Sequence, residues 1–276
     1  MKRIEYIVEY DSIIKDYIKE KESRKFLRHL KALDVEYILN GNIVRSHIEI
    51  KKGDHLELIY KDDVIKDNNF YDYPLDIVYD CPQYMILNKP RGLKTIPTGY
   101  NDFKSLYNAI LFYYKKNNIE NTIHFINRLD KDTEGLLIVA KDKRSAHTMS
   151  LMLKEINKYY LALCEGIIDK DGIISAPIKR GVGIKREIGK DGKEAKTYYK
   201  VLKHIGNNTL LELKLDSGRC HQIRLHLSSI GHPIVGDVLY GIKGDLHLTS
   251  YKLEFKCPFS GKNISYSVKP WFGDLL

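Results

Sequence analysis

Residues 126–142 read INRLDKDTEGLLIVAKD, a polar turn that runs directly into the apolar stretch LLIVA. A short apolar run bounded by a turn and by charged residues is typical of a buried strand. The acids of the turn, Asp130, Asp132 and Glu134, imitate the start of a calcium loop, D-x-D-x-E-G. The twelfth position of such a loop needs a bidentate glutamate, and this sequence has Lys141 there, so we exclude calcium.

Taken alone, this segment has an ordinary structural interpretation. Arg128, Asp130 and Lys131 would be an exposed group of charges on a surface turn that leads into a strand. Exposed ion pairs of this kind contribute little to stability. A functional interpretation therefore needs support from the rest of the chain.

The second informative stretch is residues 209–241, TLLELKLDSGRCHQIRLHLSSIGHPIVGDVLYG. Its alternating apolar start predicts a half-buried strand, a turn follows, and a helix then runs toward Gly231 as its stop. Arginine and histidine at the start of a helix make a natural anion site, because free backbone N–H groups donate there as well. We therefore take Arg219 and His221 as candidates for substrate binding.

The rest of residues 74–276 indicates a mixture of strands and helices. Runs rich in β-branched and aromatic residues predict strands at 76–80, 84–88, 135–142, 159–164 and 209–216. Helical period and length predict helices at 105–116 and 145–156. Helices do not separate the strands regularly, and no glycine-rich nucleotide-binding motif is present. We therefore expect an α+β fold and exclude a doubly wound parallel sheet.

A polar segment, residues 63–73, predicts a linker between this body and a small N-terminal unit, residues 1–62. Within the unit, SRKFLRHLKAL (23–33) has the apolar spacing of a helix. Asn40-Gly41 is a strong hairpin-turn signal, and a second turn leads into the alternating strand HLELIY (55–60).

The composition favours a polyanionic partner and a cytoplasmic location. The chain has 276 residues, of which 45 are basic and 36 acidic, giving a net charge of +9 and a pI near 9.1. Such an excess of basic residues favours nucleic acid or an anionic membrane surface as partner. No uncharged run approaches the ~18–20 residues of a membrane span. The charged N-terminus has no apolar signal-peptide core. We therefore expect a cytoplasmic protein that does not associate with a membrane.

Four cysteines, Cys81, Cys164, Cys220 and Cys257, are scattered without C-x-x-C spacing. A structural zinc site needs clustered ligands, so we expect no metal. Disulfides are not expected in a reducing compartment, and we expect buried or half-buried thiols.

Over residues 75–276 the chain resembles the RluA-type pseudouridine synthases, which isomerise uridine in RNA. Four segments carry the resemblance, in the family's order. They are YMILNKPRGLKTIPTG (84–99), INRLDKDTEGLLIVAKD (126–142), KYYLALCEG (158–166) and GRCHQIRLHLSSIGHPIVGDVLYG (218–241). The resemblance implies the fold of that family, a mixed and largely antiparallel sheet with a central cleft.

The resemblance also implies roles for individual residues. Asp130 stands at the position of the catalytic aspartate, Tyr160 at that of a tyrosine that packs on the flipped base, and Arg224 at that of an arginine paired with the aspartate. Arg128 matches an arginine that fills the space left by the flipped uridine, and Leu225 matches an apolar residue of the pocket.

The chain departs from the family pattern in two places within these segments. Asn127 stands where histidine is usual, and Cys220 stands where threonine or serine is usual. A third departure lies between the segments, where the stretch from the helix at 146 to Lys158 is a few residues short. None of the three removes a catalytic group.

The N-terminal unit resembles the S-four-like RNA-binding domain over roughly residues 12–60, in its order of basic helix, hairpin and second turn. The basic helix face carries Arg24, Arg28 and Lys31. Such a row is a solvated face in an arbitrary protein, but in this order it indicates RNA binding.

The expected partner is therefore RNA. Large-subunit ribosomal RNA comes first, because an upstream S-four-like domain is commoner in family members that act on it, and transfer RNA comes second. Isomerisation moves no electrons and carries no group, so we expect no cofactor, and we expect a monomer. The alternative is a non-catalytic RNA-binding or ribosome-assembly protein with the same fold. The presence of Asp130, Tyr160 and Arg224 favours the enzyme.

Overall fold

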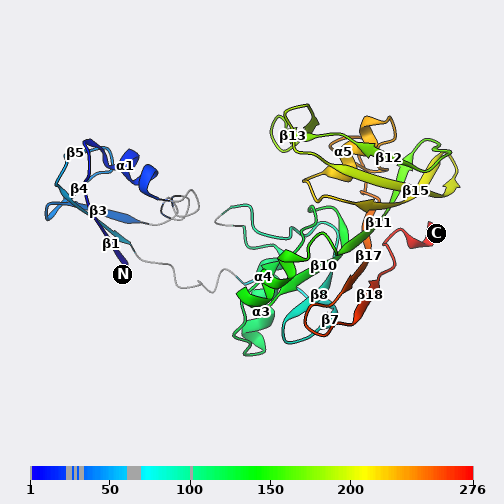
Figure 1. The fold of residues 1–276 in the computed structure, drawn as a ribbon, viewed down its shortest axis with the longest axis horizontal. Coiled ribbons are helices and arrows are strands. Elements are labelled where there is room, and N and C mark those ends of the chain that lie inside the picture. Colours follow the sequence, from blue (N-terminus) through cyan, green and yellow to red (C-terminus); the bar gives the residue numbers. More distant parts are fainter. Residues whose placement is uncertain are drawn as a thin grey trace. The chain divides into compact units, whose positions relative to one another are not determined.

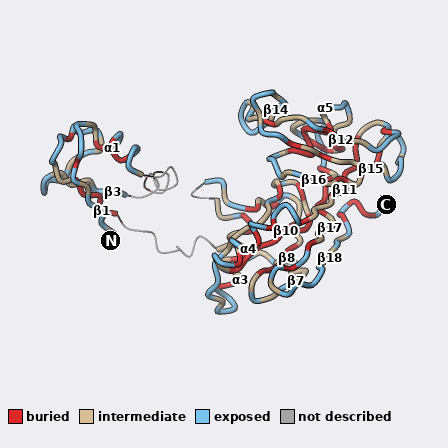
Figure 2. The backbone as a smooth tube through the Cα atoms, in the orientation of Figure 1, coloured by how far each residue is buried: buried red, intermediate tan, exposed pale blue. Residues whose placement is uncertain are grey.

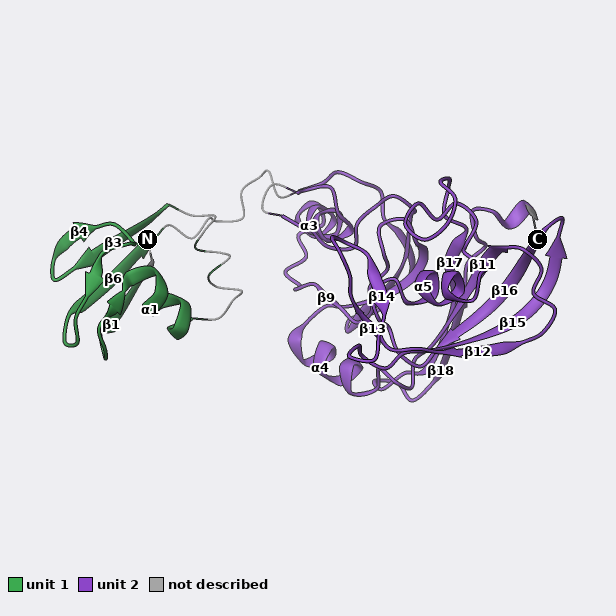
Figure 3. Cartoon of the chain, turned by 90° about the horizontal axis from the view of Figure 1, so that it is seen from above, with its two compact units in different colours: residues 1–69 green, residues 70–276 purple. Residues whose placement is uncertain are grey.

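The computed structural model describes residues 2–22, 27, 30, 34–60, 70–99 and 102–275. The chain divides into two compact units, Met1–Asn69 and Phe70–Leu276, each with its own buried interior (Figures 2 and 3). Most of the expected linker falls outside the described ranges. Among the described residues, no helix has the length and apolar character needed to cross a membrane.

The N-terminal unit is built on a four-stranded antiparallel sheet in the order β1-β6-β3-β4 (Figure 1). Its elements are β1 (Lys2–Ile7), β2 (Ser12–Ile13), α1 (Ile14–Lys21), β3 (Val35–Leu39), β4 (Asn42–Val44), β5 (Glu49–Ile50) and β6 (His55–Tyr60). Asn40 and Gly41 both have left-handed backbones, with φ of 49° and 84°, as a two-residue hairpin turn requires. The expected hairpin between β3 and β4 is therefore confirmed.

One hydrophobic cluster forms the interior of this unit. Helix α1 contributes Ile14, Tyr17 and Ile18 to it, and β6 contributes Leu56 and Leu58. The unit therefore has a core of its own.

The expected helix at 23–33 is described at two positions. Leu27 and Leu30 are both helical, and Leu30 is buried in the unit's core. The expected RNA-binding residues Arg24, Arg28 and Lys31 lie outside the described residues.

The C-terminal unit contains one large sheet flanked by short helices (Figure 1). Its elements are β7 (Asp76–Asp80), β8 (Tyr84–Lys89), α3 (Leu106–Lys116), β9 (His124–Phe125), β10 (Glu134–Ala140), α4 (Lys143–Leu151), β11 (Asn157–Glu165), β12 (Gly172–Ser175), β13 (Ile178–Arg180), β14 (Arg186–Ile188), β15 (Lys196–Ile205), β16 (Asn208–Leu215), α5 (Gln222–Ser229), β17 (Leu248–Lys256), β18 (Asn263–Ser267) and the 3-10 helix η2 (Gly273–Leu275). All five strands expected in this unit are present.

The large sheet has ten strands and is mixed, as expected. Its main path runs β12-β15-β16-β11-β17-β10-β8-β7, with β18 beside β17 and β9 beside β10. Strands β10 and β17 pair in parallel, whereas the other neighbours described in the sheet are antiparallel. At the parallel pair, a side chain on Gly135 (φ 110°) would lie 2.3 Å from the Ser250 carbonyl oxygen. The close approach of these strands therefore needs glycine.

Both faces of the sheet are buried around β8 and β10. Met85, Leu87 and Leu137 belong to a cluster that includes α3, while the alternate residues Ile86 and Leu136 belong to a second cluster that includes α4. Strands buried on both faces have nearly continuous apolar sequences. This explains the run LLIVA.

Helix α4 is shorter than its sequence period predicts. It ends at Leu151 rather than at residue 156, and Leu151 is exposed. Met152 and Ile156 nevertheless pack in the same cluster as Met149. Their burial produced the helical period, although the chain leaves the helix to reach β11.

Candidate active site

Asp130 lies in a small pocket where the loop before β10 meets the start of α5. The cavity has a volume of about 60 Å³, enough for a few water molecules. Charged groups and apolar residues share its lining. The lining residues are Arg128, Leu129, Asp130, Thr133, Tyr160, Leu215, Gly218, Arg219, His221, Gln222, Ile223, Arg224 and Leu248. We call residues 127–133 the loop wall and residues 217–224 the helix wall.

The loop wall is held by side chains that bind its main chain. The Thr95 hydroxyl donates to the Leu129 carbonyl at 2.7 Å and accepts from the Leu129 N–H at 3.3 Å. On the other side of Asp130, the Lys89 Nζ donates to the Lys131 carbonyl at 3.1 Å. The Thr133 N–H closes the turn onto the Asp130 carbonyl at 3.2 Å. The backbone is thereby fixed on both sides of Asp130.

Lys89 is fully buried beneath this loop. Its Nζ also donates to the carbonyls of Leu93 at 2.7 Å and Pro90 at 2.8 Å. Burial lowers the pKa of Lys89 to about 7, against the opposing influence of nearby carboxylates led by Asp130. Through these hydrogen bonds Lys89 links residues 90–93, which follow it in the chain, to the loop wall.

The helix wall is held by a buried pair of opposite charges. Arg224 donates from Nε to Asp237 Oδ2 at 2.7 Å and from Nη2 to Asp237 Oδ1 at 2.6 Å. The backbone N–H groups of Leu239 and Tyr240 donate to the same carboxylate. Burial acts to raise the pKa of Asp237, but the hydrogen bonds and charge of Arg224 reverse this, and the pKa is lowered.

Arg224 also faces Asp130, but less closely. Its Nη1 lies 4.0 Å from Asp130 Oδ2, at the outer limit of an ion pair. Burial acts to lower the pKa of Arg224, but Asp237 outweighs it and the pKa is raised. The guanidinium is therefore fixed by Asp237 and presented to Asp130.

His221 approaches Asp130 from the same wall. It caps α5 with a left-handed backbone (φ 56°, ψ 20°), a conformation rare for residues other than glycine. Its Nδ1 lies 3.0 Å from the Tyr240 hydroxyl and its Nε2 lies 4.0 Å from Asp130 Oδ2. Burial lowers the pKa of His221, which favours a neutral imidazole at neutral pH.

The Gln222 side chain makes four hydrogen bonds at the turn that precedes His221 and Arg224. Its Nε2 donates to the Lys196 carbonyl at 3.0 Å and to the Thr197 hydroxyl at 3.1 Å. Its Oε1 accepts from the Ser217 hydroxyl at 2.8 Å and from the Arg219 N–H at 3.1 Å. The two bonds from Nε2 hold the start of α5 against the first residues of β15, and the two bonds to Oε1 close the turn before the helix.

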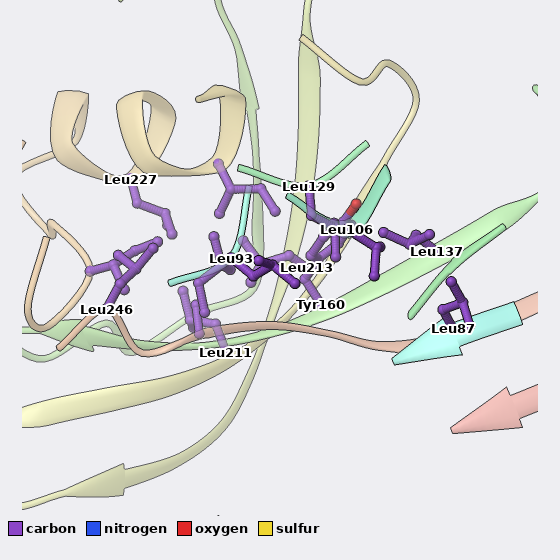
Figure 4. Packing of buried hydrophobic residues seen from close by; sticks show 14 of the residues in the cluster. Leu87, Leu93, Leu106, Leu129, Leu137, Tyr160, Leu211, Leu213, Leu227 and Leu246 are labelled. Atoms are coloured by element: carbon purple, nitrogen blue, oxygen red, sulfur yellow. The ribbon is translucent and has the colours of Figure 1, made fainter. Parts of the chain in front are cut away.

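Tyr160 forms part of the apolar floor. The pairing of β11 with β17 shifts register between Tyr159 and Leu161, a bulge of the kind that re-aims a side chain. Figure 4 shows Tyr160 among leucine side chains, close to Leu129 and Leu213. Burial raises the pKa of Tyr160 to about 12, so the phenol stays protonated at neutral pH.

The fold brings six of the sequence candidates together. They are Arg128, Asp130, Tyr160, Arg219, His221 and Arg224. Arg128 and Arg219 are exposed, at the rim. Leu225 does not line this pocket but packs with Ile178, Ala195 and Tyr240. One residue along a helix turns a side chain by about 100°, so the neighbour of Arg224 faces elsewhere.

One expectation about the cysteines is wrong. Cys81 is half-buried, and Cys164 and Cys257 are buried, but Cys220 is exposed. It occupies the turn before α5, where the chain is at the surface of the pocket wall. Solvent can therefore reach its thiol.

Four residues that support the site were not singled out from the sequence: Lys89, Thr95, Asp237 and Tyr240. A lysine at the end of an apolar strand-like run, and an aspartate set between apolar residues, were the available signals. Neither signal names a partner, because the partners lie far away in the sequence.

Known proteins share this architecture and sequence. Residues 83–229 match the family model described as RNA pseudouridylate synthase. An uncharacterized RNA pseudouridine synthase of Bacillus subtilis (strain 168) is 30% identical over 264 residues, covering 92% of this chain and 93% of that protein. Ribosomal large subunit pseudouridine synthase D of Xylella fastidiosa is 33% identical over 236 residues, covering 84% of this chain and 71% of that protein.

A solved structure agrees with these sequence matches. Human RNA pseudouridylate synthase domain containing 1 is similar with a TM-score of 0.59 and 25% identity, covering 72% of this chain and 84% of that one. The matched family model spans both walls of the Asp130 pocket. The resemblance seen in the sequence is confirmed, and the chain belongs to the RNA pseudouridine synthase family.

Proposed function

We propose that this protein isomerises uridines of large-subunit ribosomal RNA, with Asp130 as its catalytic carboxylate. The choice of RNA is supported by relatives named as ribosomal large subunit pseudouridine synthases. The role of Asp130 is supported by one observation above others. Its Oδ2 lies 4.0 Å from both the Arg224 guanidinium and the His221 ring, inside the pocket.

The reaction needs one reactive carboxylate. The bond between uracil N1 and the sugar C1′ breaks, the uracil turns, and C5 bonds to C1′. C5 loses its proton and N1 gains one, so the atoms balance without a cofactor. Asp130 either bonds to the anomeric carbon as N1 leaves and is displaced when C5 bonds to C1′, or it removes a proton from the sugar as a base and returns it when C5 bonds. Arg224 orients the charged Asp130 carboxylate while it keeps both of its hydrogen bonds to Asp237.

Tyr160 supplies an aromatic surface for the extruded base. Its ring stands on the apolar floor and its hydroxyl stays neutral, because its pKa is about 12. A protonated phenol can stack on uracil and exchange a hydrogen bond with it. It does not act as a phenolate base at neutral pH.

The target uridine must leave its stack in the RNA to reach Asp130. The exposed Arg128 side chain at the rim is free to swing aside and occupy the gap in the RNA. Extrusion costs roughly a few kcal/mol, which contacts of this kind offset.

The N-terminal unit completes the proposal as an S-four-like RNA-binding domain. Arg24, Arg28 and Lys31 contribute phosphate contacts, which position RNA without reading its sequence. Transfer RNA is the second candidate substrate. We further propose that the protein acts as a monomer in the cytoplasm.

Tritium release from RNA labelled at C5 of uracil tests the reaction, because the C5 proton leaves as pseudouridine forms. The substrates are large-subunit ribosomal RNA and transfer RNA, each from cells that lack this protein. We expect release from ribosomal RNA with the wild-type protein and none with Asp130→Asn. Release from transfer RNA alone would overturn the substrate, and release by Asp130→Asn would overturn the catalytic residue.

A further inference from the structure

Three different metal-ligating groups converge at the pocket. Asp130 offers a carboxylate oxygen, Cys220 its Sγ and His221 a ring nitrogen, and these atoms all lie within 4.8 Å of one another. One comes from the loop wall and two from the helix wall. The sequence did not indicate this group, because 90 residues separate Asp130 from Cys220.

The three groups match the ligand preferences of zinc. Zinc takes thiolate, imidazole and carboxylate ligands, and sites with three protein ligands leave a fourth position open. With bonds of about 2.0–2.3 Å in a tetrahedron, ligand atoms stand roughly 3.3–3.8 Å apart. His221 Nε2 and Asp130 Oδ2 are already 4.0 Å apart. Small side-chain rotations are enough to close the set around an ion.

The imidazole already has the outer partner that a metal ligand needs. Metal-bound histidines usually donate their other ring N–H to a hydrogen-bond partner, which fixes the ring. Here the Tyr240 hydroxyl lies 3.0 Å from His221 Nδ1. Tyr240 is itself held by the Arg186 N–H, which donates to it at 2.7 Å. His221 Nε2 is thereby left facing Asp130.

The surrounding charges do not exclude a cation. Arg224 is close to Asp130, but its charge is matched by the bidentate Asp237 carboxylate. Arg128 and Arg219 are exposed to solvent, and the Arg219 Nε donates to the Glu194 carbonyl at 3.3 Å. The Cys220 thiol loses its proton to water as its sulfur bonds to the ion, giving a second negative ligand beside Asp130.

We propose that Asp130, Cys220 and His221 form a site for a thiophilic divalent cation such as Zn²⁺, and that its occupancy blocks isomerisation reversibly. The ion is not part of the reaction. It engages the carboxylate that the reaction needs and occupies the space into which the base must move. The inhibitory half of this inference rests on the proposed role of Asp130, whereas the binding half does not.

Cobalt binding to the full-length protein without RNA tests the site directly. Co²⁺ replaces Zn²⁺ and absorbs light through its d–d bands and a thiolate-to-metal charge-transfer band. We expect one equivalent of Co²⁺ to give both, and Zn²⁺ to displace it. Cys220→Ser should lose the charge-transfer band. Loss of a residue that only supports a ligand weakens metal binding roughly tenfold or more, so loss of the ligand Cys220 should weaken Co²⁺ binding at least as much. Cys81→Ser removes a half-buried thiol elsewhere and should match wild type.

The activity arm uses tritium release with and without added Zn²⁺. We expect Zn²⁺ to inhibit the wild-type protein and a chelator to restore its rate. Cys220→Ser should resist inhibition, its rate with Zn²⁺ staying equal to its own rate without Zn²⁺. Equal inhibition of both proteins, or an unchanged cobalt spectrum in Cys220→Ser, would overturn the site.

The two arms separate the two proposals. A cobalt spectrum that depends on Cys220 in a protein inactive on every RNA would leave the site standing and overturn the proposed function. Normal isomerisation without cobalt binding would overturn the site and leave the function standing.

Discussion

The two walls of the Asp130 pocket are held by different kinds of interaction. On the loop wall, Lys89 and Thr95 bind main-chain groups, so the side chain of Asp130 is left to face the cavity. On the helix wall, Arg224 is both the structural partner of Asp237 and a group that faces Asp130. A substitution of Asp130 should therefore remove chemistry alone, whereas a substitution of Arg224 should remove chemistry and stability together.

The largest expected effect is on chemistry, from Asp130→Asn. The amide has the same shape but can neither attack C1′ nor accept a proton, so the isomerisation rate should fall at least ~100-fold. Both walls should remain intact, because their bonds near residue 130 use its main chain. Single-turnover rates and thermal unfolding are measured together. Asp132→Asn, in the same loop, is the matched control and should keep its rate. A rate above a tenth of wild type in Asp130→Asn would contradict the assignment.

Arg224→Met should give the largest loss of stability. It leaves the fully buried Asp237 carboxylate without its cation, which costs about 3–5 kcal/mol. For a unit of this size the unfolding temperature should drop by roughly 10 °C. Adding Asp237→Asn to the same protein removes the unpaired charge and should recover part of the loss. An unchanged unfolding temperature in Arg224→Met would show that the pair of Arg224 with Asp237 does not stabilise the helix wall.

Lys89→Met should have a smaller effect, on both rate and stability. It leaves three carbonyl oxygens without their donor, including that of Lys131 on the loop wall, at a cost of about 1–3 kcal/mol. Because the loop wall loses an anchor rather than a reacting group, the saturating rate should fall while RNA affinity holds. Lys94→Met removes a partly exposed lysine of the same segment and serves as the control. A loss of RNA affinity with an unchanged saturating rate would contradict an anchoring role.

The same lysine makes a pH prediction. Its pKa is about 7 in the folded protein and 10.5 in its ordinary state, so between these values the unfolded chain binds more protons. Stability should therefore rise with pH across that window. Below it Lys89 is protonated in both states, so the cost of burying its charge is constant and adds no pH dependence. Urea unfolding of wild type and Lys89→Met at pH 7, 8 and 9 should give a smaller slope in the variant. Equal slopes in the two proteins would mean that the pKa of Lys89 is not lowered to about 7.

Deleting residues 1–69 should have the smallest effect on the reaction, since both walls belong to the C-terminal unit. The saturating rate should stay within about twofold of wild type, while affinity for long RNA falls. The deletion removes Arg24, Arg28 and Lys31. Each of them that binds a phosphate should account for up to about one unit in the slope of log affinity against log salt concentration. Binding across a salt series, with the triple alanine variant as comparison, measures this. A collapsed saturating rate in a folded truncation would mean that the N-terminal unit helps to build the site.

Much of the local structure could be predicted from the sequence. The Asn40-Gly41 turn, the strand at 55–60 and the strand at 76–80 appear where turn residues and apolar alternation placed them. These signals are local, because a turn needs particular backbone angles and a half-buried strand needs a two-residue period. The end of α4 was predicted less well, because Met152 and Ile156 are buried without being helical.

The sequence by itself determined the family, through four ordered segments, and placed Asp130, Tyr160 and Arg224 in a common site. Only the tertiary structure decided their partners. In the folded protein Arg224 forms an ion pair with Asp237, and Lys89 donates a hydrogen bond to the loop wall. The exposed Cys220 lies close to Asp130. The physical reason is that a pattern along the chain reports backbone conformation and the face that is buried. Ion pairs, buried hydrogen bonds and ligand sets depend on distances of a few ångströms between segments that only folding brings together.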